Sequence, residues 1–184
     1  MTLYINCCPR RESRTDRLAR ALLAKLGDYE ELRLYDEPLQ ALDEKRLEVR
    51  ETLLAQGKFS REQFRYARQF AQADRIVVAA PFWDLSFPAQ LKIYIESIYA
   101  SGIVTRYDDR GRPEGLCRGE KLYYVTTVGG PFDGRFGYEY IKALATEYFG
   151  IPQVELVMAE GLDIEGADPE TILRKAAAEH GLSI

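Results

Sequence analysis

Histidine is nearly absent from this 184-residue sequence, with His180 as the single example. Catalysis that depends on a histidine base, and metal binding through several histidines, are therefore not expected, and we predict no metal site. The three cysteines, Cys7, Cys8 and Cys117, are odd in number and do not form the pattern of a disulfide framework. This cysteine content favours a reducing, cytoplasmic setting.

Long apolar runs and a strong excess of one charge are also missing. No apolar run approaches the roughly 20 residues that span a bilayer, so a membrane span is not expected. The opening MTLYINCCPRRES lacks the charged leader of a signal peptide, so a signal peptide is not expected either. The net charge of −4 disfavours general nucleic-acid binding. The composition is ordinary for a globular protein, and the length predicts one domain over residues 1–184.

Strand-like and helix-like segments alternate along the chain. Strands are expected at 2–6, 31–35, 75–80, 121–127 and 153–159, helices at 14–26 and 168–181, and a charged, amphipathic, partly exposed segment at 41–55. Three more helices are expected: one after a Ser60–Gln63 capping box with Phe64, Ala67 and Phe70 on one face, one opened by Pro88, and one through Tyr140, Leu144 and Tyr148 that ends near Gly150. Residues 104–118 are typical of a hairpin or loop with its turn at DDRG. The alternation predicts an α/β fold with a doubly wound parallel sheet.

In such a sheet, ligands bind beyond the carboxyl ends of the strands, at the point where the winding direction reverses. The loops 7–15, 81–88 and 127–137 should therefore meet there. The first loop offers the hydroxyls of Ser13 and Thr15 and the free N–H groups of a helix start, which suit a phosphate. Positive charge comes from four arginines, of which one or two are expected to reach the anion: Arg10, Arg11, Arg14 and Arg17.

Two observations restrict this reading of the first loop. Ser13 also fits a plain helix cap, with Asp16 completing a capping box, although that alternative leaves the arginines unexplained. The loop contains neither the Gly-x-Gly-x-x-Gly spacing of a dinucleotide fold nor the Walker signature. NAD held in the Rossmann manner and ATP hydrolysis are therefore disfavoured.

The other two loops suit a flat ligand. The second, PFWDLSF, places aromatic and aliphatic side chains directly after the most apolar strand: Phe82, Trp83, Leu85 and Phe87. The same composition is typical of a packing contact within the fold or with a partner subunit. In the third loop, Gly129 and Gly130 let the backbone approach a ligand, and paired glycines also occur in ordinary turns. Together the three loops describe a cavity with the shape of flavin mononucleotide (FMN): a phosphate end, an aromatic wall and an edge of backbone donors.

Three segments resemble one known family: AAPFWDLSFPAQLKIYIE (79–96), SGIVTRYDDRGRPEGLCRGEKLYYVTTVGG (101–130) and FGIPQVELVMAEGLD (149–163). Over nearly its full length the chain resembles the FMN-dependent NAD(P)H:quinone oxidoreductases that also reduce azo compounds. The resemblance implies a flavodoxin-like fold whose five-stranded parallel sheet has the order 2-1-3-4-5. It also implies a homodimer with each flavin near the subunit boundary.

The resemblance assigns residues to the cofactor by position. By this resemblance, Ser13, Arg14 and Thr15 would hold the phosphate. Residues 82–85 would line the isoalloxazine ring, and residues 127–130 would contact its other edge. With Arg10 from the basic loop and Pro81 at the strand end, the predicted cofactor-binding residues are Cys8, Arg10, Ser13, Arg14, Thr15, Pro81, Phe82, Trp83, Asp84, Leu85, Thr127, Val128, Gly129 and Gly130.

Two positions depart from the family. Asp84 stands where the family generally has asparagine, and a carboxylate beside the flavin should lower its reduction potential unless it is protonated or turned away. Cys8 stands where the family usually has serine, and a thiol is a poorer hydrogen-bond partner than a hydroxyl. For the adjacent Cys7 and Cys8, we expect two small buried residues rather than a strained redox bridge.

The implied reaction is ping-pong: NAD(P)H passes hydride to the flavin and leaves, and a quinone or azo compound then takes two electrons. No catalytic side chain is assigned with certainty, since the cofactor carries the chemistry and solvent supplies the proton. The N–H groups of Gly129 and Gly130 are expected to stabilise charge near flavin N1 and O2. Two alternatives stay open: a one-electron carrier of the flavodoxin type, and a protein of this fold with weak or lost FMN binding.

Overall fold

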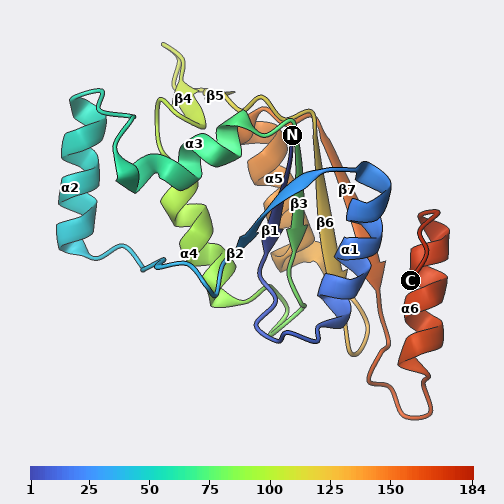
Figure 1. Ribbon diagram of the computed structural model, residues 1–184. Coiled ribbons are helices and arrows are strands. Elements are labelled where there is room, and N and C mark those ends of the chain that lie inside the picture. The colour runs from blue at the N-terminus through green and yellow to red at the C-terminus, as the bar shows by residue number, and fades with distance from the viewer.

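A computed structural model describes all 184 residues, and its centre is one parallel sheet (Figure 1). The sheet strands are β1 (Thr2–Asn6), β2 (Tyr29–Arg33), β3 (Arg75–Ala79), β6 (Lys121–Thr127) and β7 (Gln153–Ala159). Their order is β2-β1-β3-β6-β7. Counted among sheet strands alone this is 2-1-3-4-5, so the predicted doubly wound topology is confirmed.

Helices connect the strands. They are α1 (Arg14–Leu26), α2 (Glu44–Ala55), α3 (Arg65–Gln72), α4 (Ala89–Ile98), α5 (Tyr138–Ala143) and α6 (Pro169–Glu179). Two short 3-10 turns, η1 (Glu62–Phe64) and η2 (Gly134–Phe136), precede α3 and α5, and a π-helical segment, η3 (Leu144–Phe149), continues α5. The predicted hairpin is present as β4 (Thr105–Tyr107) and β5 (Pro113–Gly115), with the N–H of Gly111 donating to the carbonyl of Asp108 in its turn.

Two layers of helices cover the sheet (Figure 1). On one face, α1 and α6 bury leucines such as Leu18, Leu22 and Leu173 against the sheet. On the other face, α3, α4 and α5 bury Phe70 and Leu91 in a second cluster. In contrast, α2 stands apart from the sheet and buries none of its residues. None of the helices combines the length and the apolar character needed to cross a membrane.

Two local predictions were wrong. The second strand begins at Tyr29 rather than at residue 31, because Tyr29 pairs with Thr2 at the start of β1 and the register then runs to Arg33. The Ser60–Gln63 capping box does not form, since η1 begins after Arg61 and no side chain caps it. The predicted apolar face of α3 is nevertheless correct, with Ala67 and Phe70 buried.

Candidate functional site

A pocket of about 410 Å³ opens at the carboxyl ends of the strands. This volume lies within the roughly 300–1,000 Å³ that small-molecule sites occupy. Its walls come from the loops after β1, β3 and β6, as the topology predicted, and from a fourth loop after β7. The lining residues are Pro9, Arg10, Glu12, Ser13, Arg14, Thr15, Pro81, Phe82, Trp83, Thr127, Val128, Gly129, Leu162 and Asp163. The structure therefore brings most of the predicted cofactor-binding residues together.

The start of α1 forms one end of the pocket. Ser13 is the N-cap, and its Oγ accepts a hydrogen bond from the N–H of Asp16 at 3.3 Å. The N–H groups of Arg14 and Thr15, in the first turn, have no acceptor within the helix and carry the positive end of its dipole. The Thr15 hydroxyl is 2.6 Å from the Thr127 hydroxyl, which joins the first loop to the end of β6. This end of the pocket suits an anion.

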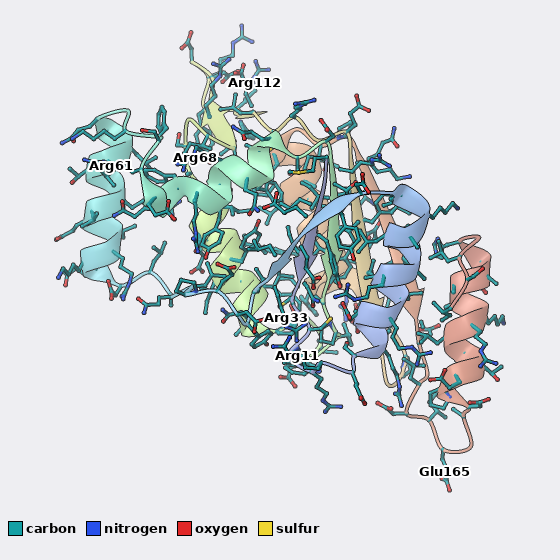
Figure 2. The ribbon with its side chains drawn as sticks, in the orientation of Figure 1. Arg11, Arg33, Arg61, Arg68, Arg112 and Glu165 are labelled. Atoms are coloured by element: carbon teal, nitrogen blue, oxygen red, sulfur yellow. The ribbon has the colours of Figure 1, made fainter.

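Two of the four arginines of the first loop line the pocket, namely Arg10 and Arg14. Arg17 is used elsewhere, because its two terminal nitrogens pair with Glu170 on α6 at 2.7 and 2.9 Å. Arg11 is exposed at the carboxyl edge of the sheet, with Nη2 3.6 Å from an oxygen of Asp36 (Figure 2). The pocket thus keeps two cations that can approach a bound phosphate.

A buried polar network supports the first loop from below, and we call its residues Tyr4, Asn6, Asp16 and Arg20 the Asp16 network. The Asp16 carboxylate accepts from the Tyr4 hydroxyl at 2.5 Å, from the Asn6 amide at 2.9 Å and from Arg20 Nε at 2.9 Å. The alternative in which the Asp16 side chain completes a capping box is therefore not realised, since partners on β1 and the next turn of α1 occupy its oxygens. Burial raises the pKa of Tyr4, which remains a neutral donor to this carboxylate. The Asn6 side-chain oxygen in turn accepts from the N–H of Cys8 at 2.9 Å, which fixes the loop.

Cys8 lies behind the pocket wall rather than in its lining. Its thiol is buried and donates weakly to the carbonyl of Ala79 at 3.8 Å. Burial raises the pKa of Cys8 to about 11 and that of Cys7 to about 12, so both thiols are protonated at neutral pH. All three cysteines are free, and the expected pair of small buried residues at the strand end is confirmed.

The loop after β3 supplies Pro81, Phe82 and Trp83 to the lining. Beyond them the chain makes a tight turn, closed by backbone hydrogen bonds between Trp83 and Ser86 at 3.0 and 2.8 Å. Asp84 and Leu85, at the centre of this 83–86 turn, have φ angles of 50° and 67° and are exposed, so they lie outside the lining. Asp84 is therefore not among the residues that border the pocket.

The two glycines after β6 occupy different environments. Gly129 lines the pocket, and a Cβ placed there would lie 2.5 Å from Oδ2 of Asp163. Gly130 is outside the lining, and a Cβ there would meet nothing within 4 Å. A side chain at 129 would therefore have to displace the Asp163 carboxylate, and the backbone there borders the pocket without one. A side chain at 130 would meet no such obstacle.

Four lining residues were missed from the sequence: Pro9, Glu12, Leu162 and Asp163. Leu162 and Asp163 follow β7, an edge strand that pairs with β6, and β6 is the strand that leads to Gly129. Because the carboxyl end of β7 lies at the same rim of the sheet, the topological rule that predicted the other three loops also covers the loop after β7. Asp163 is the most informative of the four, since its Oδ1 lies 3.1 Å from Nη1 of Arg14.

The topology and the pocket define a doubly wound α/β protein with a mononucleotide-sized site beyond its strand ends. The chain belongs to the family described as having a flavodoxin-like fold, whose model matches residues 1–182.

Curated relatives agree over most of the chain. An FMN-dependent NADH:quinone oxidoreductase 2 of Clostridium acetobutylicum is 39% identical over 149 residues, which cover 78% of this chain and 73% of the relative. The FMN-dependent NADH:quinone oxidoreductase of Coprothermobacter proteolyticus is 31% identical over 194 residues, covering 96% and 94% of the two chains.

Solved structures share the fold. An azoreductase from Bacillus anthracis superposes with a TM-score of 0.82 at 24% identity, covering 97% of this chain and 95% of that one. An FMN-dependent NADH-azoreductase of the same species, solved in complex with FMN, gives 0.79 at 22% identity, with 97% and 94% coverage.

The residues present in the pocket fit FMN. The helix start with Arg10 and Arg14 matches a phosphate, and the hydroxyls of Thr15 and Thr127 give a polar middle. Phe82 and Trp83 supply an apolar wall for a planar ring. The backbone at Gly129 borders the same cavity without a side chain.

Proposed function

We propose that this protein is an FMN-dependent oxidoreductase that passes two electrons from NADH to quinones or azo compounds. The observation that carries the proposal is the convergence of three loops, distant in the sequence, on one pocket with an anion-binding end and an aromatic wall. Relatives that share up to 39% identity over most of the chain are named for this activity. The structural neighbours add azo compounds as acceptors, and NADH as the reductant.

The chain's own residues would hold the cofactor by its phosphate. The N–H groups of Arg14 and Thr15 offer hydrogen bonds aligned with the α1 dipole, and the Ser13 hydroxyl stands beside them. Arg10 and Arg14 add charge-assisted contacts. Cys8 contributes from behind the wall, through the backbone that the Asp16 network fixes.

At the other end, Phe82 and Trp83 would orient the ring, while Pro81 ends the strand that leads to them. FMN, when bound, supplies the two-electron chemistry, taking hydride from a nicotinamide and giving electrons to the acceptor. The backbone at Thr127, Val128 and Gly129 borders the same cavity, and its N–H groups, with that of Gly130, would stabilise negative charge on the ring edge. Asp84 and Leu85 would meet the ring only if the 83–86 turn rearranged.

The proposal extends to the assembly and its setting. We assign the cofactor to one domain formed by the whole chain, in a cytoplasmic homodimer with each flavin near the subunit boundary. Large apolar side chains exposed in the loop after β3 support such a boundary, namely Trp83 and Leu85.

The first test is the visible spectrum of the purified protein after FMN reconstitution, followed by anaerobic NADH and then menadione. The proposal expects flavin absorbance that NADH bleaches without any added reductase and that menadione restores. Bleaching that requires a separate reductase would establish an electron carrier instead. A protein that stays colourless and gives no heat on titration with FMN would establish a fold that has lost its cofactor.

A matched pair of variants tests the ring wall. Trp83 is 44% exposed and lines the pocket, whereas Phe136 is 52% exposed and does not. Trp83→Ala should weaken FMN binding by about tenfold, the loss expected for a stacked aromatic contact of about 1 kcal/mol or more. Phe136→Ala should leave the affinity within about twofold of the parent. Equal effects of the two substitutions would contradict the assignment of Trp83 to the ring.

A further inference from the structure

The acidic residue Asp163 has no assigned role, yet it stands inside the proposed cofactor pocket. Its side chain is 72% exposed, and Oδ1 lies 3.1 Å from Nη1 of Arg14, one of the two lining arginines. A carboxylate beside a phosphate site opposes the binding of a dianion, both by direct repulsion and by occupying the cation. The position of Asp163 therefore calls for a functional explanation.

The backbone holds Asp163 firmly in place. The N–H of Asp163 donates to the carbonyl of Gly129 at 2.9 Å, and the N–H of Leu162 donates to that of Val128 at 3.2 Å. These bonds tie the loop after β7 to the glycine loop after β6. The glycine at 129 leaves room for the carboxylate, since a Cβ there would lie 2.5 Å from Oδ2. The backbone of Asp163 is thus part of the framework of the pocket, and it keeps the carboxylate within reach of Arg14.

Arg14 can reach more than one anionic partner. Its side chain is 43% exposed and has a long, flexible stem, and Asp163 is its only ion-pair partner. In contrast, Arg17 is committed to Glu170 by two hydrogen bonds. The Arg14 guanidinium can therefore exchange the Asp163 carboxylate for a phosphate seated at the first turn of α1. An exposed ion pair of this kind is weak enough to be exchanged.

We propose that Asp163 competes with the cofactor phosphate for Arg14 and so limits how strongly the pocket prefers FMN over riboflavin. This inference rests on the proposed function, because it concerns the same pocket. In the absence of an anion, Arg14 pairs with Asp163. When the phosphate enters, Arg14 turns to it, and the cofactor binds more weakly than it would to a free arginine. A ligand without a phosphate does not engage this competition.

The central test is the substitution Asp163→Asn, with FMN and riboflavin affinities measured by quenching of flavin fluorescence. Exposed ion pairs are worth up to about 1 kcal/mol, so removing the competitor should raise FMN affinity about threefold to fivefold. Riboflavin affinity should stay within about 1.5-fold. The matched control is Glu165→Gln, which removes one negative charge from the tip of the same loop, where the side chain points away from the sheet (Figure 2). Glu165→Gln should leave the FMN and riboflavin affinities within about 1.5-fold of the parent values.

A double-variant cycle separates competition from general electrostatics. Arg14→Gln alone should lower FMN affinity about tenfold, as expected for loss of one charge-assisted contact, with little effect on riboflavin. In that background Asp163→Asn should raise FMN affinity less than about twofold, because no arginine remains to be released. An equal gain in both backgrounds, or a loss of FMN and riboflavin binding together, would overturn the competition.

The outcomes distinguish this inference from the function on which it rests. If the parent protein binds no FMN, the proposed function fails, and there is no bound phosphate with which Asp163 could compete for Arg14. If the parent binds FMN and turns over NADH, but Asp163→Asn leaves the FMN affinity unchanged, the function stands and the role of Asp163 is refuted. A gain confined to FMN and dependent on Arg14 supports both.

Discussion

The two ends of the pocket are built in opposite ways. Beneath the phosphate end, Tyr4, Asn6 and Asp16 of the Asp16 network are buried, and the carboxylate accepts hydrogen bonds from three different side chains. At the ring end, the 83–86 turn is exposed and depends on one pair of backbone bonds and on the Ser86 hydroxyl, which donates to the carbonyl of Phe136 at 2.7 Å. Its two central residues also hold left-handed φ angles that are unfavourable for side chains other than glycine.

This contrast indicates that the anion-binding end is organised before the cofactor arrives, whereas the ring end gains contacts on binding. A preorganised first loop needs little reordering when a phosphate binds. The exposed turn has the strained backbone that often occurs at ligand-binding segments. The predictions below test each side of this comparison.

The largest expected effect is at the buried end. Asp16→Ala removes the carboxylate acceptor that Tyr4, Asn6 and Arg20 share. Tyr4 and Asn6 are buried, so solvent cannot replace the lost acceptor. We expect the free energy of unfolding, measured with urea, to fall by about 3 kcal/mol. Asp16→Asn keeps an acceptor oxygen and should cost about half as much. If both substitutions proved neutral, the network would not be the support described.

A smaller effect concerns the buried thiols behind the first loop. Burial raises the pKa of Cys7 to about 12 and that of Cys8 to about 11, whereas an unfolded thiol titrates near 9. The stabilising contribution of the two thiols is therefore complete below the unfolded pKa near 9, and it is lost as the pH rises toward the folded pKa. The free energy of unfolding should fall by about 1 kcal/mol per thiol between pH 9 and pH 10.

The double variant Cys7→Ala, Cys8→Ala is the control for this alkaline loss. It should show a shallower decline, with the remainder due to buried tyrosines such as Tyr4 and Tyr94, whose pKa values burial also raises. A decline as steep as that of the parent would show that the thiols are not the titrating groups.

The smallest effect belongs to the exposed turn. Leu85→Gly should raise the free energy of unfolding by up to about 1 kcal/mol, because glycine adopts a φ of 67° without strain. Leu85→Ala keeps the strain and serves as the matched comparison. Both are measured by urea unfolding of the cofactor-free protein. A glycine variant less stable than the alanine variant would mean that the turn is unstrained.

The sequence predicted the fold and the start of α1 well because both follow short-range rules. The apolar runs located the five strands, and the order of a doubly wound sheet then placed their carboxyl ends at one rim. Ser13 was correctly expected as the cap of α1, since the rule needs only the residue type and the helix that follows.

Other features depended on contacts that no local pattern encodes. Asp16 was expected to complete the cap, but Tyr4 and Asn6, ten or more residues away, bind its carboxylate instead. Asp84 lies outside the pocket lining because the 83–86 turn adopts left-handed φ angles without a glycine. The residue types in this loop do not predict such a turn. Asp163 reaches Arg14 across 149 positions of chain, and only the folded sheet brings them together.

The most direct measurement of the central claim is a crystal structure of the protein grown with FMN. The account predicts the phosphate within about 3 Å of the N–H groups of Arg14 and Thr15, and the ring between Trp83 and the backbone at Gly129. It also predicts that Arg14 has left Asp163. FMN bound outside this pocket, or a phosphate that contacts neither N–H group, would contradict it.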